Sequence, residues 1–194
     1  MVVGASLVLL VALPTAYMNV AGRSFPSDQT PEGAYLRVVL ALRNDRPEDT
    51  FAYLETEAQW ATLSYLDYRK RAAARVRETY PDAEAAELLG TLLPAADAKD
   101  GPALLALEMR RRGWQRRLKR DLSGVARVEK NGERATVETV RGTRYPFRRR
   151  ENGIWGITLF TAELKQEAER AARDYEVVER AANDYRAARP SSSR

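Results

Sequence analysis

The sequence contains no cysteine and no histidine among its 194 residues. Without cysteine, the chain has no disulfide, no thiolate to bind a metal or attack a substrate, and no cysteine to carry a lipid. Without histidine, it lacks the commonest general base and the commonest metal ligand. Any catalysis would depend on Asp, Glu, Tyr, Ser, Thr or Lys, and we predict neither a cofactor nor a metal.

Acidic residues are missing from residues 110–120, where seven of the eleven positions are Lys or Arg. Residues 141–150 carry five more arginines and again no acid. Because the formal net charge of the whole chain is only +5, the rest of the chain is net acidic. The positive charge is therefore local, which matters more for a partner than for the fold. The length predicts one domain with an anchor or a tail.

Charged side chains are also absent from residues 1–22, an apolar run long enough to cross a bilayer as a helix. Three interpretations compete: a transmembrane anchor, a cleaved signal sequence and a buried helix. The polar residues 23–30 indicate a linker, which argues against a buried helix, and the basic leading region of a signal sequence is missing. We predict a membrane-anchored protein with a periplasmic, extracytoplasmic domain, which would be secreted if residues 1–22 were cleaved.

Helical periodicity follows the linker. Thr30, with proline and glutamate after it, predicts a helix start, and residue 47 is a proline that opens a short second helix. Thr56 is expected to cap a long third helix. Its apolar spacing predicts a buried side that comprises Trp60, Leu63, Leu66 and Val76. A fourth helix is expected over residues 83–89, capped by Asp82 and ended by Gly90, and residues 92–102 predict a loop before the last helix of this part.

From Gly124 onward the periodicity becomes twofold, which is typical of strands. Three turn pairs separate the alternating runs: Asn131-Gly132, Arg141-Gly142 and Asn152-Gly153. The apolar sides comprise Ala126, Val128, Ala135, Val137, Tyr145, Phe147, Trp155 and Ile157. The pattern predicts a four-stranded antiparallel meander, with a bulge or bend at Pro146 because a central strand needs the missing donor. The fold class is therefore α+β.

A long C-terminal helix is expected from Thr161 to about residue 188, followed by a disordered tail, residues 189–194. Its apolar positions are spaced alternately by four and three residues: Leu164, Ala168, Ala171, Tyr175, Val178, Ala182 and Tyr185. This heptad pattern predicts a helix-association seam of the coiled-coil kind. The seam would hold a second copy or a partner helix, or it would pack along the chain's own domain; the sequence leaves both open.

Two parts of the chain resemble the nuclear transport factor 2-like superfamily, also called SnoaL-like or ketosteroid-isomerase-like. Residues 30–54 (TPEGAYLRVVLALRNDRPEDTFAYL) are similar to its opening, and VARVEKNGERATVET and RRRENGIWGITL are similar to its terminal strands. The resemblance implies a curved sheet that forms a cone with a pocket over residues 31–160, as in many uncharacterised bacterial membrane-attached or secreted proteins. The long basic insert, residues 56–122, and the extended C-terminal helix depart from the family's pattern.

No catalytic residue is carried over from that resemblance. Active members use an Asp or a His-Asp pair in the cone, and no acid here matches such a motif. The remaining carboxylates are Asp67 beside Tyr68, and Glu129 and Glu138, which alternate with apolar strand residues and should face solvent. No phosphate loop, metal cluster or nucleophile motif is present. We therefore predict that the protein is not an enzyme.

The basic stretch is predicted to form a single amphipathic helix, with Trp114 and Leu118 on its inward side. The predicted cationic surface comprises Arg110, Arg112, Arg116, Arg117, Lys119 and Arg120, joined by Arg148, Arg149 and Arg150 from a strand end. This surface would face water, anionic lipid or an acidic partner. Nucleic acid is the least favoured partner, because one tryptophan on the apolar side provides no stacking platform.

These features together favour a non-enzymatic, membrane-anchored envelope protein that acts as a protein-interaction or assembly domain. Its expected partners are a membrane, through residues 1–22, and a protein or second copy, through the C-terminal helix. Two alternatives stay open. One is a small-molecule pocket or a minor ketosteroid-isomerase-like enzyme, which rests on the resemblance alone. The other is nucleic-acid binding through the basic helix.

Overall fold

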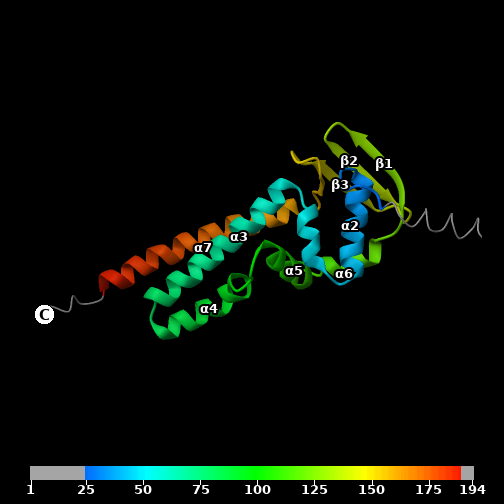
Figure 1. Ribbon diagram of the computed structural model, residues 1–194. Helices are drawn as coiled ribbons and strands as arrows, with labels where there is room; N and C mark the ends of the chain where they lie inside the picture. The colour runs from blue at the N-terminus through cyan, green and yellow to red at the C-terminus, as the bar shows by residue number, and fades with distance from the viewer. Residues whose placement is uncertain (1–24, 189–194) are drawn as a thin grey trace, which may run out of the picture.

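The structure, a computed structural model, describes residues 25–188 and has the predicted α+β class (Figure 1). Six α-helices, one 3-10 helix and four strands follow in the order α2 (Pro31–Arg43), η1 (Pro47–Tyr53), α3 (Thr56–Thr79), α4 (Asp82–Ala96), α5 (Gly101–Arg111), α6 (Trp114–Asp121), β1 (Val125–Asn131), β2 (Arg134–Thr139), β3 (Arg144–Arg149), β4 (Trp155–Ile157) and α7 (Thr161–Ala188). The predicted anchor and tail lie outside the described residues. Within residues 25–188, no helix is both long and apolar enough to span a membrane.

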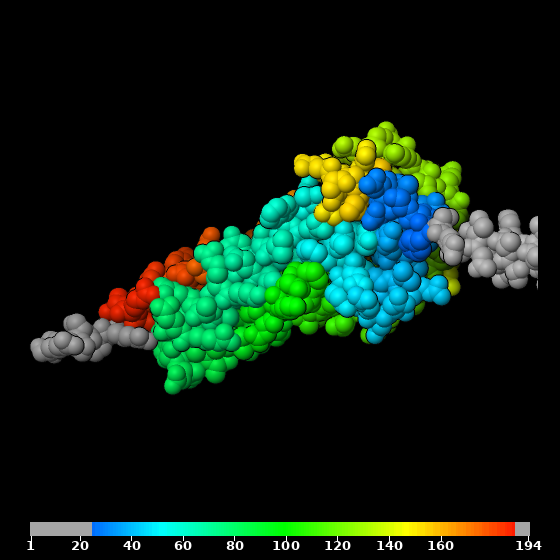
Figure 2. Space-filling model, in the orientation of Figure 1, coloured from blue at the N-terminus to red at the C-terminus, as the bar shows by residue number. Residues whose placement is uncertain are grey.

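The molecule is elongated, with the sheet at one end and a helical arm at the other (Figures 1 and 2). The sheet end also contains α2, α5 and α6. The arm consists of α3 and α7, which run side by side, with α4 packed against α3 at the far end. The long C-terminal helix is therefore confirmed, and it belongs to the body of the protein.

The sheet is the predicted antiparallel meander, in the order β1-β2-β3-β4. Gly132, Gly142 and Gly153 have positive φ angles at the three predicted turns. The bend predicted at Pro146 is wrong: Pro146 pairs in regular register with Thr136, and the irregularity lies in β1 between Val125 and Arg127. The Thr158 amide, just beyond the end of β4, donates to the Pro146 carbonyl. The nitrogen and the carbonyl of one strand residue face the same neighbouring strand, so the Pro146 nitrogen faces β4 and its missing N–H removes no hydrogen bond to β2.

The main core lies between the inner face of the sheet and helices α2 and α6. Its largest side chains from the sheet are Val137, Tyr145, Phe147, Trp155 and Ile157, all nearly inaccessible. The apolar side predicted for β1 is not buried, since Ala126 and Val128 are both exposed. Strand β1 is one of the two edge strands, and it extends beyond the helices that cover β2 and β3.

The segment predicted as a linker is attached to the domain from Asp28 onward. The Trp155 amide donates to the Asp28 carbonyl at 3.2 Å, and the Trp155 indole donates to the Gln29 carbonyl at 3.0 Å. Thr30 then caps α2 as predicted, with its hydroxyl accepting from the Gly33 amide at 3.1 Å. Residues 28–30 are therefore part of the fold.

Helix α4 is longer than predicted. It continues through Gly90 and Pro94 to Ala96, and its N-cap residue is Pro81 instead of Asp82. Leu92 and Ala96 are buried against α3, and this burial offsets the hydrogen bond that proline removes from the helix. The predicted loop therefore begins only after Ala96.

The basic stretch forms two helices and not one. Gly113 has φ +69°, a left-handed conformation that ends α5 and begins α6. The break re-aims the chain, so that α5 lies beside η1 and α3 while α6 lies beside α2. Trp114 and Leu118 are buried as predicted, and the Trp114 ring stacks on Phe160 with centroids 4.6 Å apart.

Candidate interaction surfaces

The predicted seam of α7 is occupied by the chain's own helices. Val178 packs in a cluster with Ala72, Ala73 and Val76 of α3, and other seam residues pack in the same way. Ala171, for example, shares a second cluster with residues of α3, α4 and α5. Small side chains on both helices let α3 and α7 approach closely. The seam therefore packs along the chain's own domain, which is one of the two alternatives left open by the sequence, and it is not a free surface for a partner helix.

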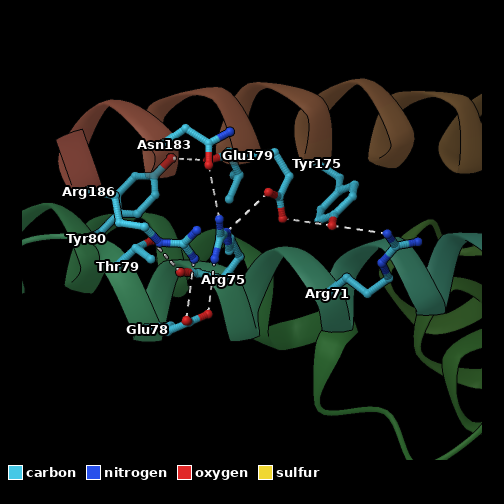
Figure 3. Close-up of polar contacts among 10 residues, drawn as sticks. Arg71, Arg75, Glu78, Thr79, Tyr80, Tyr175, Glu179, Asn183 and Arg186 are labelled. Carbon is cyan, nitrogen blue, oxygen red and sulfur yellow. Dashed lines mark hydrogen bonds and ion pairs between the residues drawn. The ribbon is translucent and has the colours of Figure 1, made fainter.

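Polar contacts close the sides of this α3–α7 interface (Figure 3). Arg75 pairs with Glu179 at 3.2 Å and donates to Asn183 at 3.3 Å. Further along the arm, Arg71 donates to the Tyr175 hydroxyl at 3.1 Å, and that hydroxyl donates to Glu179 at 2.8 Å. These contacts fix the register of the two helices and leave the seam no room for another chain.

Arg112, which the sequence placed on the cationic surface, is directed into the molecule instead. Its Nε donates to Glu108 at 2.7 Å, and its terminal nitrogen pairs with Glu167 at 2.7 Å. Both carboxylates are almost inaccessible, with 1% and 7% of the side chain exposed. Arg112 therefore joins α5 to α7 and cannot contribute to an external surface.

Three more of the predicted cations have partners within the fold. Lys119 donates to Asp45 at 2.8 Å, and this hydrogen bond holds the pKa of Asp45 below its ordinary value. Arg148 pairs with Glu57 at 3.3 Å, and Arg150 donates to a backbone carbonyl of η1. Among residues 25–188, six of the predicted cations have no ion-pair partner: Arg110, Arg116, Arg117, Arg120, Arg149 and Arg150, of which Arg150 has the backbone hydrogen bond just described.

The two groups of arginines do not form one surface, contrary to the prediction. Arg141, in the turn before β3, donates to the Arg120 carbonyl at the end of α6. Arg148, near the opposite end of β3, pairs with the start of α3. A strand of six residues separates its ends by about 17 Å. The arginines of α6 and those at residues 148–150 are therefore separate groups.

The carboxylates considered for catalysis all have structural partners. Glu129 and Glu138 lie on the outer face of the sheet, where Arg144 pairs with them at 2.7 and 3.7 Å. Asp67 pairs with Arg71 at 3.5 Å on the exposed side of α3. No group of three or more acidic residues within the described chain could hold a metal ion.

Glu55 is a buried carboxylate that sequence reasoning missed. It precedes α3, accepts from the Thr161 hydroxyl at the start of α7, and lines an open groove of about 460 Å³ with Phe147 and Arg148. Gly156 allows this arrangement, because a Cβ there would lie 2.5 Å from the Glu55 Cα. Glu55 thus joins β4 to the starts of both long helices, which is a structural role.

An exposed apolar patch lies where the sequence predicted buried residues. Trp60 is 63% exposed and Leu63 is 40% exposed, whereas Leu66 and Val76 are buried as predicted. Phe51 of η1 lies beside Leu63, since a side chain at Gly101 would meet both of them. We define the Trp60 patch as Phe51, Trp60 and Leu63. It lines a groove of about 350 Å³ whose other lining residues are Thr56, Gln59, Arg150, Glu151 and Asn152.

The inward side of α3 is marked by small residues and not by the largest apolar ones. Ala58, Ala61, Ala72 and Ala73 are buried, and they recur at helical spacing with Tyr65. That alanine spacing is the signal from which the exposure of Trp60 could have been inferred.

Comparison with protein-family models, curated proteins and solved structures found no significant match. Function is therefore inferred from the surfaces of the chain itself.

Proposed function

We propose that this chain is a non-enzymatic protein-interaction domain that residues 1–22 anchor to a membrane, with the domain on the extracytoplasmic side. The observation that carries the proposal is the Trp60 patch, which exposes a tryptophan beside a leucine and a phenylalanine. Large apolar side chains gathered on one surface typically mark a protein contact. The interaction surface is thus assigned to α3 and η1, in place of the α7 seam. The superfamily resemblance and its cone-shaped pocket stay predictions.

The partner that fits this patch is a protein segment with apolar side chains. The Trp60 patch forms the apolar part of the groove's lining, and the polar part, called the rim here, includes one cation, Arg150, and one anion, Glu151. Because these two charges balance, the rim attracts neither an acidic nor a basic segment. Affinity would come from burial of the Trp60 and Leu63 side chains, and tryptophan is among the residues enriched at binding hot spots.

The anchor is tested by fractionation of cells that express the full chain. We expect the protein to stay in the membrane pellet after a carbonate wash, because an apolar helix of residues 1–22 is held by the hydrocarbon core. Recovery of the full chain in the soluble fraction would contradict the anchor.

The patch is tested by a photo-crosslinking amino acid at residue 60 in native membranes. We expect a discrete adduct that Leu63→Glu weakens at least about tenfold, since a charge in a desolvated contact is costly. Val177→Glu is the matched control, because Val177 is 55% exposed on α7 and lies outside the groove. An adduct that Leu63→Glu leaves unchanged, or that Val177→Glu weakens equally, would contradict the assignment of the patch.

A further inference from the structure

We infer that the free arginines of α6 form a docking face for an anionic lipid surface, which orients the domain on its membrane. The α6 face is defined as Arg116, Arg117 and Arg120 of α6, together with Arg110 in the last turn of α5. This inference rests on the proposed membrane anchor and adds to it the surface that contacts the lipid headgroups. Its evidence is the pairing of the cations, their position on α6 and the place where the chain enters the fold.

The α6 face consists of the cations of residues 110–120 that have no carboxylate partner among residues 25–188. Residues 110–120 contain seven cations, of which Arg111, Arg112 and Lys119 have carboxylate partners. The other four are exposed and have no ion-pair partner within residues 25–188. By contrast, most cations of α3 and α7 pair with acids of the arm. Positive charge is therefore concentrated on this one helix and its N-terminal neighbour.

The side of α6 that carries this charge points away from the core. Arg116 and Arg120 are four residues apart and lie opposite Trp114 and Leu118, which the core holds. The stacking of Trp114 on Phe160 fixes the helix to the domain, so the arginines project from a rigid base. Arg141 adds another cation at the C-terminal end of α6, where it donates to the Arg120 carbonyl. Guanidinium groups bind phosphate oxygens through paired hydrogen bonds.

The chain enters the domain at the level of α2 where α6 ends. The Tyr35 hydroxyl donates to the Ser123 carbonyl, just beyond α6, at 2.8 Å. Two residues further along α2, the Arg37 guanidinium lies 5.0 Å from the centre of the Phe25 ring. Because residues two apart on a helix project to opposite sides, the first described residue and the end of α6 lie at the same level along α2 but on opposite sides of it. An anchor in residues 1–22 would hold the α6 face near the bilayer surface, where tethering raises its effective concentration.

Lipid fits this face better than a nucleic acid does. Single-stranded nucleic acids stack their bases on exposed aromatic rings among the cations. The aromatic residue of α6, Trp114, is buried and already stacked within the core. Anionic headgroups need no such ring, and each basic side chain near the bilayer strengthens binding. The charges without partners and the chain entry at the level where α6 ends both favour the lipid surface.

The test measures how close the α6 end lies to vesicles that contain the full chain. Because the chain has no cysteine, Ala126→Cys provides a single donor label near α6, and Ala86→Cys provides a control label on α4. Energy transfer to an acceptor lipid is compared in phosphatidylcholine vesicles and in vesicles with phosphatidylglycerol. We expect stronger transfer from residue 126 with the anionic lipid, and we expect salt at about 0.5 M to remove the difference.

Charge reversal identifies the residues responsible. The triple variant Arg116→Glu, Arg117→Glu, Arg120→Glu should reduce the lipid-bound fraction of the domain at least about tenfold. The matched variant Arg77→Glu, Arg173→Glu, Arg180→Glu makes the same change in net charge on the arm and should leave that fraction unchanged. Transfer that is equal in both vesicles, or equally affected by the two triple variants, would overturn the inference.

Two further outcomes separate this inference from the proposed anchor. A chain that fails to float with either vesicle refutes the anchor, and the oriented docking face fails with it. A chain that floats but shows no dependence on lipid charge refutes the α6 face alone. A salt-sensitive complex with single-stranded RNA, lost in the α6 triple variant while lipid charge has no effect, would assign the face to nucleic acid and overturn the inference.

Discussion

Arg112 is the cation whose removal should destabilise the domain most. It contacts Glu108 and Glu167 at 2.7 Å each, and neither carboxylate is accessible to water. In Arg112→Leu, the neighbours that stay within reach are Arg111, 2.9 Å from Glu108, and Arg170, 3.2 Å from Glu167. Both of these arginines are more than half exposed, so they compensate weakly for buried charge.

The expected loss in the free energy of unfolding is about 3–5 kcal/mol at pH 7, the range for a buried ion pair that loses one partner. Arg111→Leu is the matched control, because Arg111 contacts the same Glu108 but has 54% of its side chain exposed. The control should lose at most about 1 kcal/mol. Urea unfolding of the full chain in mild detergent, followed by tryptophan fluorescence, measures both values.

The loss should also depend on pH. Burial alone would raise the pKa of Glu167, but the hydrogen bond and charge of Arg112, together with the charge of Arg170, hold that pKa below its ordinary value. A lowered pKa in the folded state stabilises the protein above the ordinary pKa of the carboxyl, and this contribution is lost as the pH falls through the lowered pKa. Without Arg112, the burial that raises the pKa of Glu167 loses its strongest opposing contact, so Glu167 favours its protonated form more than in the wild type.

The difference in stability between wild type and Arg112→Leu should therefore narrow from pH 7 to about pH 4, since protonation relieves the unpaired charge in the variant. A loss below about 1 kcal/mol at pH 7 would refute the reasoning, because it would mean that water reaches the two carboxylates. A difference that stays constant over this pH range would refute the electrostatic cause and leave only lost packing.

Two further predictions concern the sheet. The Tyr145 hydroxyl is buried without a hydrogen-bond partner among the described residues, so Tyr145→Phe should keep the free energy of unfolding or raise it by about 1 kcal/mol. Burial raises the pKa of Tyr145 to about 12, so between pH 10 and 12 the free energy of unfolding of the wild type should fall by roughly 2 kcal/mol more than that of the variant; alkaline unfolding with parallel curves would argue against this. Gly156→Ala places a Cβ 2.5 Å from the Glu55 backbone, so it should lower the free energy of unfolding in urea by about 3 kcal/mol. Gly90→Ala adds a Cβ in open space within α4, so it should raise the free energy of unfolding by about 1 kcal/mol. Equal effects of the two alanines would contradict the close approach.

The sheet was the part of the fold most open to prediction. Its three glycine turns and its alternating apolar residues depend on neighbours a few positions away, and the meander followed from them. Trp114 and Leu118 were also placed correctly, because they share a helix side with a single apolar stripe. The prediction for the buried side of α3 was correct for Leu66 and Val76 and wrong for Trp60 and Leu63, because it placed the largest apolar residues inward. The close approach of α7 instead selects alanine there, and Trp60 faces outward.

The sequence by itself determined the α+β class, the strand order, the helix start at Thr30 and the local excess of arginine, since each depends on composition or on short-range spacing. Only the tertiary structure decided which charges and apolar residues are available to a partner. Arg112 pairs with the buried Glu167 of α7 and is therefore not available to a partner, and the seam of α7 is buried against α3. These contacts join side chains that are far apart in the sequence, and a local sequence pattern does not indicate which distant side chains come into contact.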